Sequence, residues 1–292
     1  MWYNKGPLVC QIIENLKKVV TPESDLRTRI LATAEMIVVY FLRPEWVRDR
    51  VYTTNAKDTF YTIAGRKPDE VTRYQNRYVH FADYLFTLCD TEGFDVLLDR
   101  LKSPESRAHH YEARIAYHFR NGGFNILMRK EAGGTRGSNF EFRAEKSGER
   151  INVEVTALTS DEPTKANIYS ALKNKRTQVP RDEPAALYVL LNGLWTPDMS
   201  RPTSILTAAT SRFFGHSHRY NYIEYMWESL IRDDDVDTYF DQVYPIVHLS
   251  PRTPTKFGPL TYKSTPIFAC VGGDMRTAIP AHFNFMEIVR AL

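Results

Sequence analysis

Hydrophobic residues recur at helical spacing along residues 7–104. The stretch DLRTRILATAEMIVVYFLRPEW opens with Asp25 as a plausible N-cap, and Pro44 ends its pattern. Its apolar positions repeat every three or four residues: Leu26, Ile30, Leu31, Ala34, Ile37 and Val38. The stretch NRYVHFADYLFTLCD repeats this pattern. The pattern predicts an all-helical N-terminal domain over residues 1–105.

The pattern changes at LKSPESRA, residues 101–108, which marks a domain boundary. A helix is predicted from about Ala108 until Gly122 and Gly123 end it. Strands are predicted at residues 124–130 and 139–145, with a glycine-rich loop between them. In the second strand, Phe140 and Phe142 alternate with Asn139, Glu141 and Arg143.

Residues 151–158, INVEVTAL, also alternate, after a predicted turn at KSGE. Ile151, Val153 and Val155 share one face of this strand, and Asn152, Glu154 and Thr156 share the other. A helix over residues 165–179 and a buried strand over residues 185–195 follow. The order helix, strand, strand, strand, helix, strand predicts an antiparallel hairpin, then a crossover helix and a parallel pairing. Residues 106–292 are therefore expected to form an α/β domain with a mixed sheet flanked by helices.

The last hundred or so residues carry weaker patterns. We predict helices at RPTSILTAATSRFF, residues 201–214, and at YNYIEYMWESLI, residues 220–231. Strands are predicted at YPIVHLS, residues 244–250, and at TPIFACVGG, residues 265–273.

Composition fits a globular protein, because 43% of the 292 residues are hydrophobic and 25% are charged. The net charge is only +3, so a site for a polyanion has to come from local clustering of basic residues. Three widely spaced cysteines, Cys10, Cys89 and Cys270, argue against a disulfide framework or a zinc site. With no signal-peptide pattern and no long apolar stretch, the expectation is a cytoplasmic protein that does not enter a membrane.

One strand carries an acid that the core does not need: Glu154 lies among aliphatic residues in INVEVTAL. Its surroundings resemble the PD-(D/E)xK nuclease superfamily, which has the restriction-endonuclease-like fold. The resemblance covers residues 108–192 only, and the positions that match the family's site are Glu112, Asn139, Glu154, Thr156, Lys175 and Gln178. Two of them depart from the family, since Asn139 stands where the family has an aspartate and Thr156 where it has a lysine.

The resemblance implies a divalent-metal-dependent nuclease that hydrolyses phosphodiester bonds of DNA or RNA. Mg²⁺ or Mn²⁺ would be held by Glu112, Asn139 and Glu154, because hard cations prefer oxygen ligands. Glu154, Lys175, Gln178 and Thr156 would form the catalytic set.

The two departures weaken this site in different ways. Asn139 offers a neutral oxygen, which removes one negative charge from the metal site. Glu141, two residues along the strand, either supplies the missing carboxylate or is a surface charge. Thr156 has only a hydroxyl to offer a phosphate or a water.

Lys175 compensates for the missing lysine if its ammonium points into the site. Ile168, Leu172, Lys175 and Val179 follow one another at spacings of four, three and four, so Lys175 lies on the helix face directed to the sheet. Basic residues also gather near the site, where they either contact a phosphate backbone or are ordinary solvated charges: Arg129, Lys130, Arg136, Arg143, Lys165, Lys173, Lys175 and Arg176.

Two alternatives to an active nuclease stay open. The first is a nuclease-like module that has lost catalysis and binds nucleic acid or regulates a partner, which the two departures favour. The second is a protein-interaction scaffold without nucleic acid, which the modest net charge permits. The N-terminal helical domain would bind substrate, a partner or a second copy of the chain in a homo-oligomer.

Overall fold

The structure is a computed structural model and describes residues 5–54, 60–103, 106–130, 139–158, 164–191, 202–216, 219–233, 236–243, 246–250, 268–271, 274–277 and 283–292. The chain divides into two compact units. Unit 1 contains Met1–Tyr117, Leu230–Asp241 and Lys263–Leu292, and unit 2 contains His118–Ser229 and Gln242–Tyr262. C-terminal segments therefore join the predicted helical domain in unit 1, and α6, Ser106–Asn121, runs from unit 1 into unit 2.

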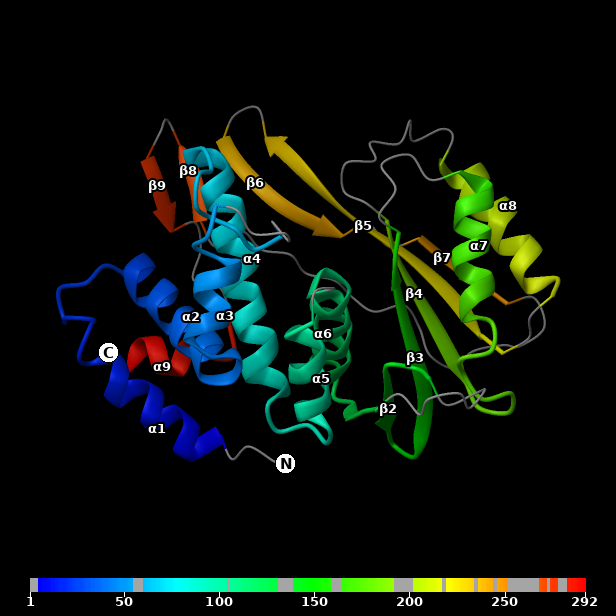
Figure 1. Cartoon of the computed structure of the whole chain (residues 1–292), viewed down its shortest axis with the longest axis horizontal. Coiled ribbons are helices and arrows are strands. Elements are labelled where there is room, and N and C mark those ends of the chain that lie inside the picture. The colour runs from blue at the N-terminus through cyan, green and yellow to red at the C-terminus, as the bar shows by residue number, and fades with distance from the viewer. Residues whose placement is uncertain are drawn as a thin grey trace. The chain divides into compact units, whose positions relative to one another are not determined.

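Unit 1 is built mainly from helices (Figure 1). Besides the first part of α6, the end of one strand and most of another, its elements are α1 (Lys5–Leu16), α2 (Leu26–Leu42), α3 (Pro44–Arg50), α4 (Pro68–Leu88), α5 (Phe94–Leu101), β8 (Phe268–Val271), β9 (Asp274–Thr277) and α9 (Met286–Arg290). The start of α2 agrees with the prediction, because the Asp25 side chain accepts a hydrogen bond from the Thr28 amide at 2.7 Å. Pro44 begins α3, where its missing N–H costs nothing.

A buried carboxyl group, Asp83, links three segments of unit 1. It accepts hydrogen bonds from the Tyr117 hydroxyl and from the Asn284 backbone amide, both at 2.8 Å. Burial raises the pKa of Asp83 to about 7, and these hydrogen bonds lower it only in part. The residues just before α9 are thereby tied to α4.

Unit 2 contains the predicted order of elements around one mixed sheet. After α6 come β1 (Asn125–Met128), β2 (Phe142–Lys146), β3 (Glu149–Ala157), α7 (Lys165–Lys175), β4 (Ala185–Leu191), α8 (Pro202–Phe214), β5 (Tyr222–Asp233), β6 (Val236–Val243) and β7 (Ile246–Leu249). The last four residues of β5 and most of β6 belong to unit 1. The strand order is β1-β2-β3-β4-β5-β6, and β7 also pairs with β5. The pairs β1–β2 and β2–β3 are antiparallel, and the pairs β3–β4 and β4–β5 are parallel. This confirms the α/β class and both predicted kinds of pairing.

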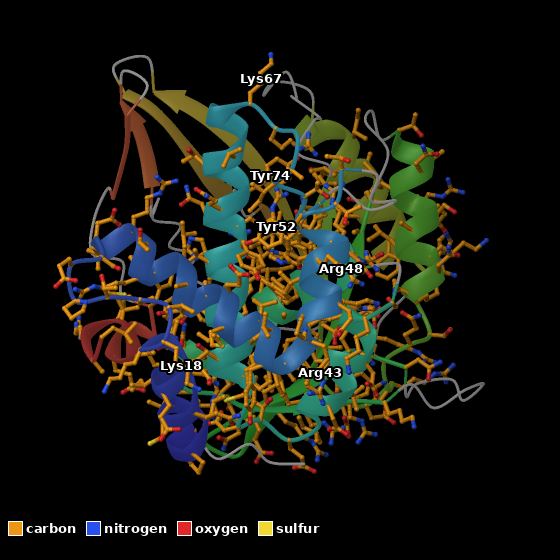
Figure 2. All side chains as sticks on the ribbon, turned by 60° about the vertical axis from the view of Figure 1, so that its left-hand side comes forward. Lys18, Arg43, Arg48, Tyr52, Lys67 and Tyr74 are labelled. Carbon is orange, nitrogen blue, oxygen red and sulfur yellow. The ribbon has the colours of Figure 1, made fainter. Side chains whose placement is uncertain are left out.

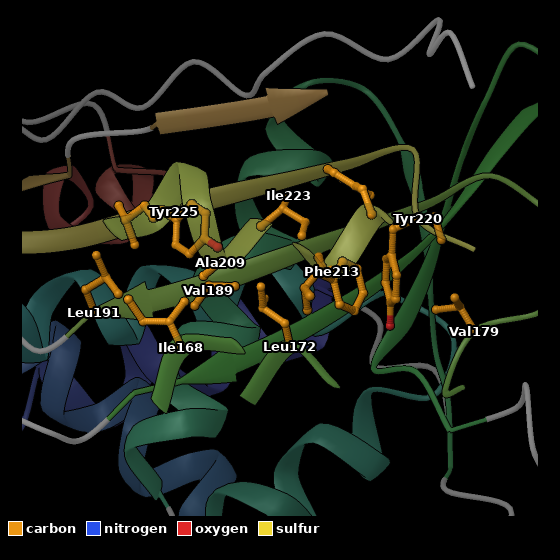
Figure 3. Packing of buried hydrophobic residues seen from close by; sticks show 14 of the residues in the cluster. Ile168, Leu172, Val179, Val189, Leu191, Ala209, Phe213, Tyr220, Ile223 and Tyr225 are labelled. Carbon is orange, nitrogen blue, oxygen red and sulfur yellow. The ribbon is translucent and has the colours of Figure 1, made fainter. Parts of the chain in front are cut away.

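Two helices, α7 and α8, pack against one face of this sheet (Figure 1). Their side chains Ile168, Leu172 and Phe213 meet Val189 and Ile223 of the central strands in one buried cluster (Figure 3). Burial of such side chains contributes roughly 1.5–3 kcal/mol each, so this layer holds α7 firmly on the sheet.

Tight turns set the register of the antiparallel strands. Ser147 and Gly148 have φ of 54° and 78°, the two positive values that a two-residue type I′ hairpin needs. Lys146 and Glu149 therefore pair directly, as the predicted turn at KSGE requires. Gly123 has φ of 83° just after α6, where the Phe124 amide reaches back to the Phe119 carbonyl.

Two predictions about local structure are wrong. Residues 220–231, predicted as a helix, contain most of β5, a strand whose residues 222–226 are all buried between β4 and β7. Phe140 does not share a face with Phe142: Phe140 belongs to the cluster below α7, whereas Phe142 contacts Phe119 of α6. β2 begins only at Phe142, so simple alternation does not extend back to residue 140.

The strands predicted at residues 244–250 and 265–273 correspond to β7 and β8, and the helix predicted at residues 201–214 corresponds to α8. The glycine-rich loop at residues 131–138 lies outside the described residues. Among the described residues, no helix is both long and apolar enough to cross a membrane.

Candidate active site

Glu154 is buried on the sheet face that α7 and α8 cover. It lies in β3 directly beside Leu187 of β4, a member of the apolar cluster beneath these helices. Its relative exposure is 0%. A carboxylate in such a place loses its hydration, which costs several kcal/mol unless other groups compensate.

Lys175 provides that compensation from the last residue of α7. Its Nζ forms an ion pair with Oε1 of Glu154, and its side chain is 21% exposed. Ile168 and Leu172 are fully buried, so the predicted inward face of this helix is correct. The helix itself ends at Lys175 and not at residue 179 as predicted, and Val179 is buried in the turn that follows. The helix begins where the Thr164 hydroxyl accepts a hydrogen bond from the Asn167 amide.

The C-terminal end of α7 is held by residues that precede β5. The Tyr220 hydroxyl donates to the Lys175 carbonyl at 2.8 Å, and Arg219 donates to the carbonyls of Thr177 and Val179 at 3.1 and 2.8 Å. The first bond reaches the last carbonyl of α7, and the other two hold the turn that follows the helix. They fix the backbone from which Lys175 reaches Glu154.

Tyr220 is itself buried, next to Phe213 in the cluster (Figure 3). Burial raises the pKa of its hydroxyl well above the ordinary value, and the charge of Glu154 raises it further. The hydroxyl therefore stays protonated and serves as a hydrogen-bond donor. Sequence reasoning missed Tyr220 and Arg219, because nothing in the local pattern shows that they reach α7.

Asn139 and Gln178 meet at the same end of α7. The Asn139 amide donates to the Gln178 carbonyl at 3.1 Å, and the Gln178 amide donates to the Lys175 carbonyl at 3.2 Å. Asn139 Oδ1 and Gln178 Oε1 are buried, and among the described residues neither accepts a hydrogen bond. Buried acceptors without partners are rare and call for an explanation.

The remaining residues near Glu154 have weaker claims. Thr156 lies two residues further along β3 and is half-buried. Glu141 is half-buried, with its backbone amide bonded to the Val153 carbonyl, and its charge helps to raise the pKa of Tyr220.

Glu112 belongs to unit 1, whereas the other predicted site residues belong to unit 2. Its carboxylate is buried and forms an ion pair with Arg100 of α5. Its second oxygen lies 3.2 Å from Nδ1 of His109, one turn earlier on α6. Both oxygens thus have partners inside unit 1, and a metal-binding role for Glu112 stays a prediction.

A second polar network lies at the start of β3. The Asn152 side chain and Arg143 both donate to Oε2 of Glu183, and Arg150 lies 3.3 Å from its other oxygen. Burial raises the pKa of Glu183, but the bond from Asn152 and the two arginine charges outweigh it, so that the pKa is lowered overall. Arg143, one of the predicted phosphate-binding residues, is therefore already paired.

The predicted ligands Glu154 and Asn139 fit a hard cation in kind, because they offer carboxylate and amide oxygens. The negative charge that these ligands offer a divalent cation is low, because Asn139 is neutral. Among the described residues, no three His, Cys, Asp or Glu side chains lie together as a metal-binding group. Glu154 forms an ion pair with Lys175, whose charge it offsets.

Fold and site together define an α/β protein with a mixed sheet and a buried acid–lysine pair between the sheet and a crossover helix. No protein-family model matches the chain, and no curated protein is significantly similar to it in sequence.

Proposed function

We propose that this chain is a divalent-metal-dependent nuclease that hydrolyses phosphodiester bonds of DNA or RNA. The chain order α6-β1-β2-β3-α7-β4, with parallel β3 and β4, supports the resemblance to a restriction-endonuclease-like fold. The acid on β3 and the lysine on the following helix occupy the positions that the resemblance to the PD-(D/E)xK superfamily assigns to the site.

The observation that carries the proposal is the buried Glu154–Lys175 pair. Replacing a buried ion pair with apolar residues is often neutral or stabilises a protein by about 1–4 kcal/mol. Stability alone therefore gives little reason for a carboxylate below α7. A chemical role explains why the acid lies there, together with two amide oxygens that accept no hydrogen bond from described residues.

The residues divide the work by their chemistry. Glu154 would hold the cation, with Oδ1 of Asn139 as a neutral second ligand and Gln178 Oε1 available to orient a water. Lys175 would turn its ammonium toward the phosphate as the substrate arrives, and Tyr220 keeps the backbone of Lys175 in place. Thr156 would contribute a hydrogen bond at most. A bound Mg²⁺ or Mn²⁺ supplies phosphate neutralisation and an activated water.

One observation favours the second candidate, a nuclease-like module without catalysis that binds nucleic acid. The acid and the lysine already offset each other's charge, and Asn139 adds none. A cation would therefore meet a site of low net negative charge.

Cleavage of plasmid DNA and of RNA with Mg²⁺ or Mn²⁺, with and without EDTA, tests the proposal. We expect cleavage that EDTA abolishes and that Glu154→Gln lowers at least 100-fold. Glu145→Gln is the matched control, because Glu145 is an exposed acid on the neighbouring strand β2. Full activity in Glu154→Gln would refute the proposal. A silent native protein that still binds nucleic acid would favour the second candidate.

A further inference from the structure

The outward surface of α7 and α8 contains basic and aromatic side chains and no acids. Residues 164–181 and 199–223 contain no Asp or Glu, although the whole chain has 35 acids against 38 bases. The two helices pack side by side on the sheet (Figure 1). These two segments together contain eight Lys and Arg residues and no acid, while the net charge of the chain is only +3.

The basic residues of α7 form one stripe along the helix. Lys165, Tyr169, Lys173 and Arg176 follow one another at spacings of four, four and three, which places them on a common helical face. Lys165 and Lys173 are exposed, and neither forms an ion pair with a described residue. The stripe lies beside the inward face that carries Lys175.

Tyr169 of α7 contacts two arginines, Arg212 of α8 and Arg176 at the end of its own helix. The guanidinium carbon of Arg212, in the last turn of α8, lies 4.1 Å from the centre of the Tyr169 ring. Arg176 donates a hydrogen bond to the Tyr169 hydroxyl at 3.2 Å. The ring thus holds both guanidinium groups in defined positions, as a pre-organised surface for phosphates requires.

We propose that this surface, formed by Lys165, Tyr169, Lys173, Arg176 and Arg212, binds the phosphate backbone of a nucleic-acid strand without reading its bases. Closely spaced cations provide sequence-independent affinity for phosphates, and guanidinium and tyrosine groups are typical of such contacts. The inference rests on the proposed function, because the nucleic-acid strand bound along α7 would be the one cleaved at Glu154. A nucleic-acid strand that lies along the stripe would approach the C-terminal end of α7, where Lys175 and Gln178 lie.

Fluorescence anisotropy with labelled single-stranded DNA, single-stranded RNA and duplex DNA tests the surface in EDTA, so that cleavage plays no part. The test variant is Lys165→Gln/Lys173→Gln/Arg212→Gln, which removes three exposed charges. The control is Lys18→Gln/Arg43→Gln/Arg48→Gln, which removes three exposed charges from unit 1 (Figure 2). Circular dichroism checks that both variants are folded.

We expect the slope of log affinity against log salt to fall by about two units for a single strand, at about 0.7 for each lost phosphate contact. The control should keep the native slope. Equal slopes for the two variants would overturn the proposal. So would a protein that binds no nucleic acid but binds phosphatidylserine vesicles, if the test variant loses that vesicle binding. Loss of binding in the test variant, with no cleavage by the native protein in Mg²⁺, would support the surface and refute only the proposed catalysis.

Discussion

Removing the lysine from the buried pair should destabilise unit 2 far more than removing both charges. Lys175→Met leaves the Glu154 carboxylate, which is 0% exposed, without its counter-charge. Opposite charges in contact attract by about 4 kcal/mol at an effective dielectric constant near 20. Breaking a buried pair on one side costs about 3–5 kcal/mol. Because Lys175 is 21% exposed, we expect the lower part of this range, about 3 kcal/mol.

The double variant Glu154→Leu/Lys175→Met should recover that loss. Its apolar side chains would join the cluster that already contains Leu172 and Leu187. We expect a free energy of unfolding within about 1 kcal/mol of the native protein, or above it. The coupling energy of the cycle would then exceed about 2 kcal/mol. Cleavage should be lost in the double variant although the fold is retained.

Hydrogen exchange at the amides of β3 and β4 is the suitable assay, because it reports the stability of this sheet separately from that of unit 1. Urea unfolding gives an independent value. Lys173→Met is the matched control, since Lys173 is exposed on the same helix. A change below about 1 kcal/mol for Lys175→Met would refute the reasoning. So would a double variant as unstable as Lys175→Met.

Three further changes test other parts of the argument. Asn139→Asp should tighten Mg²⁺ binding about tenfold or more by calorimetry, because it adds a carboxylate with little change in size; an unchanged affinity would remove Asn139 from the metal site. Asp83 has a pKa of about 7 in the folded protein, against an ordinary value of 3.8, so between these values the native state binds a proton that the unfolded chain does not. The free energy of unfolding should therefore fall as pH rises from about 4 to 7, by about 1.4 kcal/mol per pH unit. Asp83→Asn should remove this part of the pH dependence in urea unfolding, and an unaltered pH profile would contradict the assignment. Gly123→Ala should cost about 1 kcal/mol in urea unfolding, because φ is 83° while the added methyl group meets only the flexible end of Lys146; no loss would argue against the left-handed turn.

Much of unit 2 could be predicted because its signals are local. Alternation with a period of two identifies β3, and the spacing of Ile168, Leu172 and Lys175 identifies the inward face of α7. Glycines mark the ends of α6 and the turn between β2 and β3. The direction of Lys175 followed from the same helical spacing.

The prediction failed where burial removes the periodic signal. Residues 222–226 of β5 are buried on both faces, so their sequence YIEYM shows no polar alternation and fits a helix equally well. Tertiary contacts also lie beyond the local pattern. Tyr220 lies 45 residues from Lys175, and the Tyr220 hydroxyl bond to the Lys175 carbonyl depends on how β5 is placed beside α7.

The charge balance at Glu154 links the two proposals. With Lys175 in contact and Asn139 uncharged, the site offers a cation little net attraction. A phosphodiester lying along α7 would bring the negative charge that the site lacks, and Mg²⁺ is commonly held by one or two carboxylates together with substrate phosphates. The phosphate would also give the Lys175 ammonium a second partner, which releases Glu154 from full neutralisation. On this proposal, the acid-free segments of α7 and α8 would place the substrate so that its phosphate supplies negative charge to a cation at Glu154.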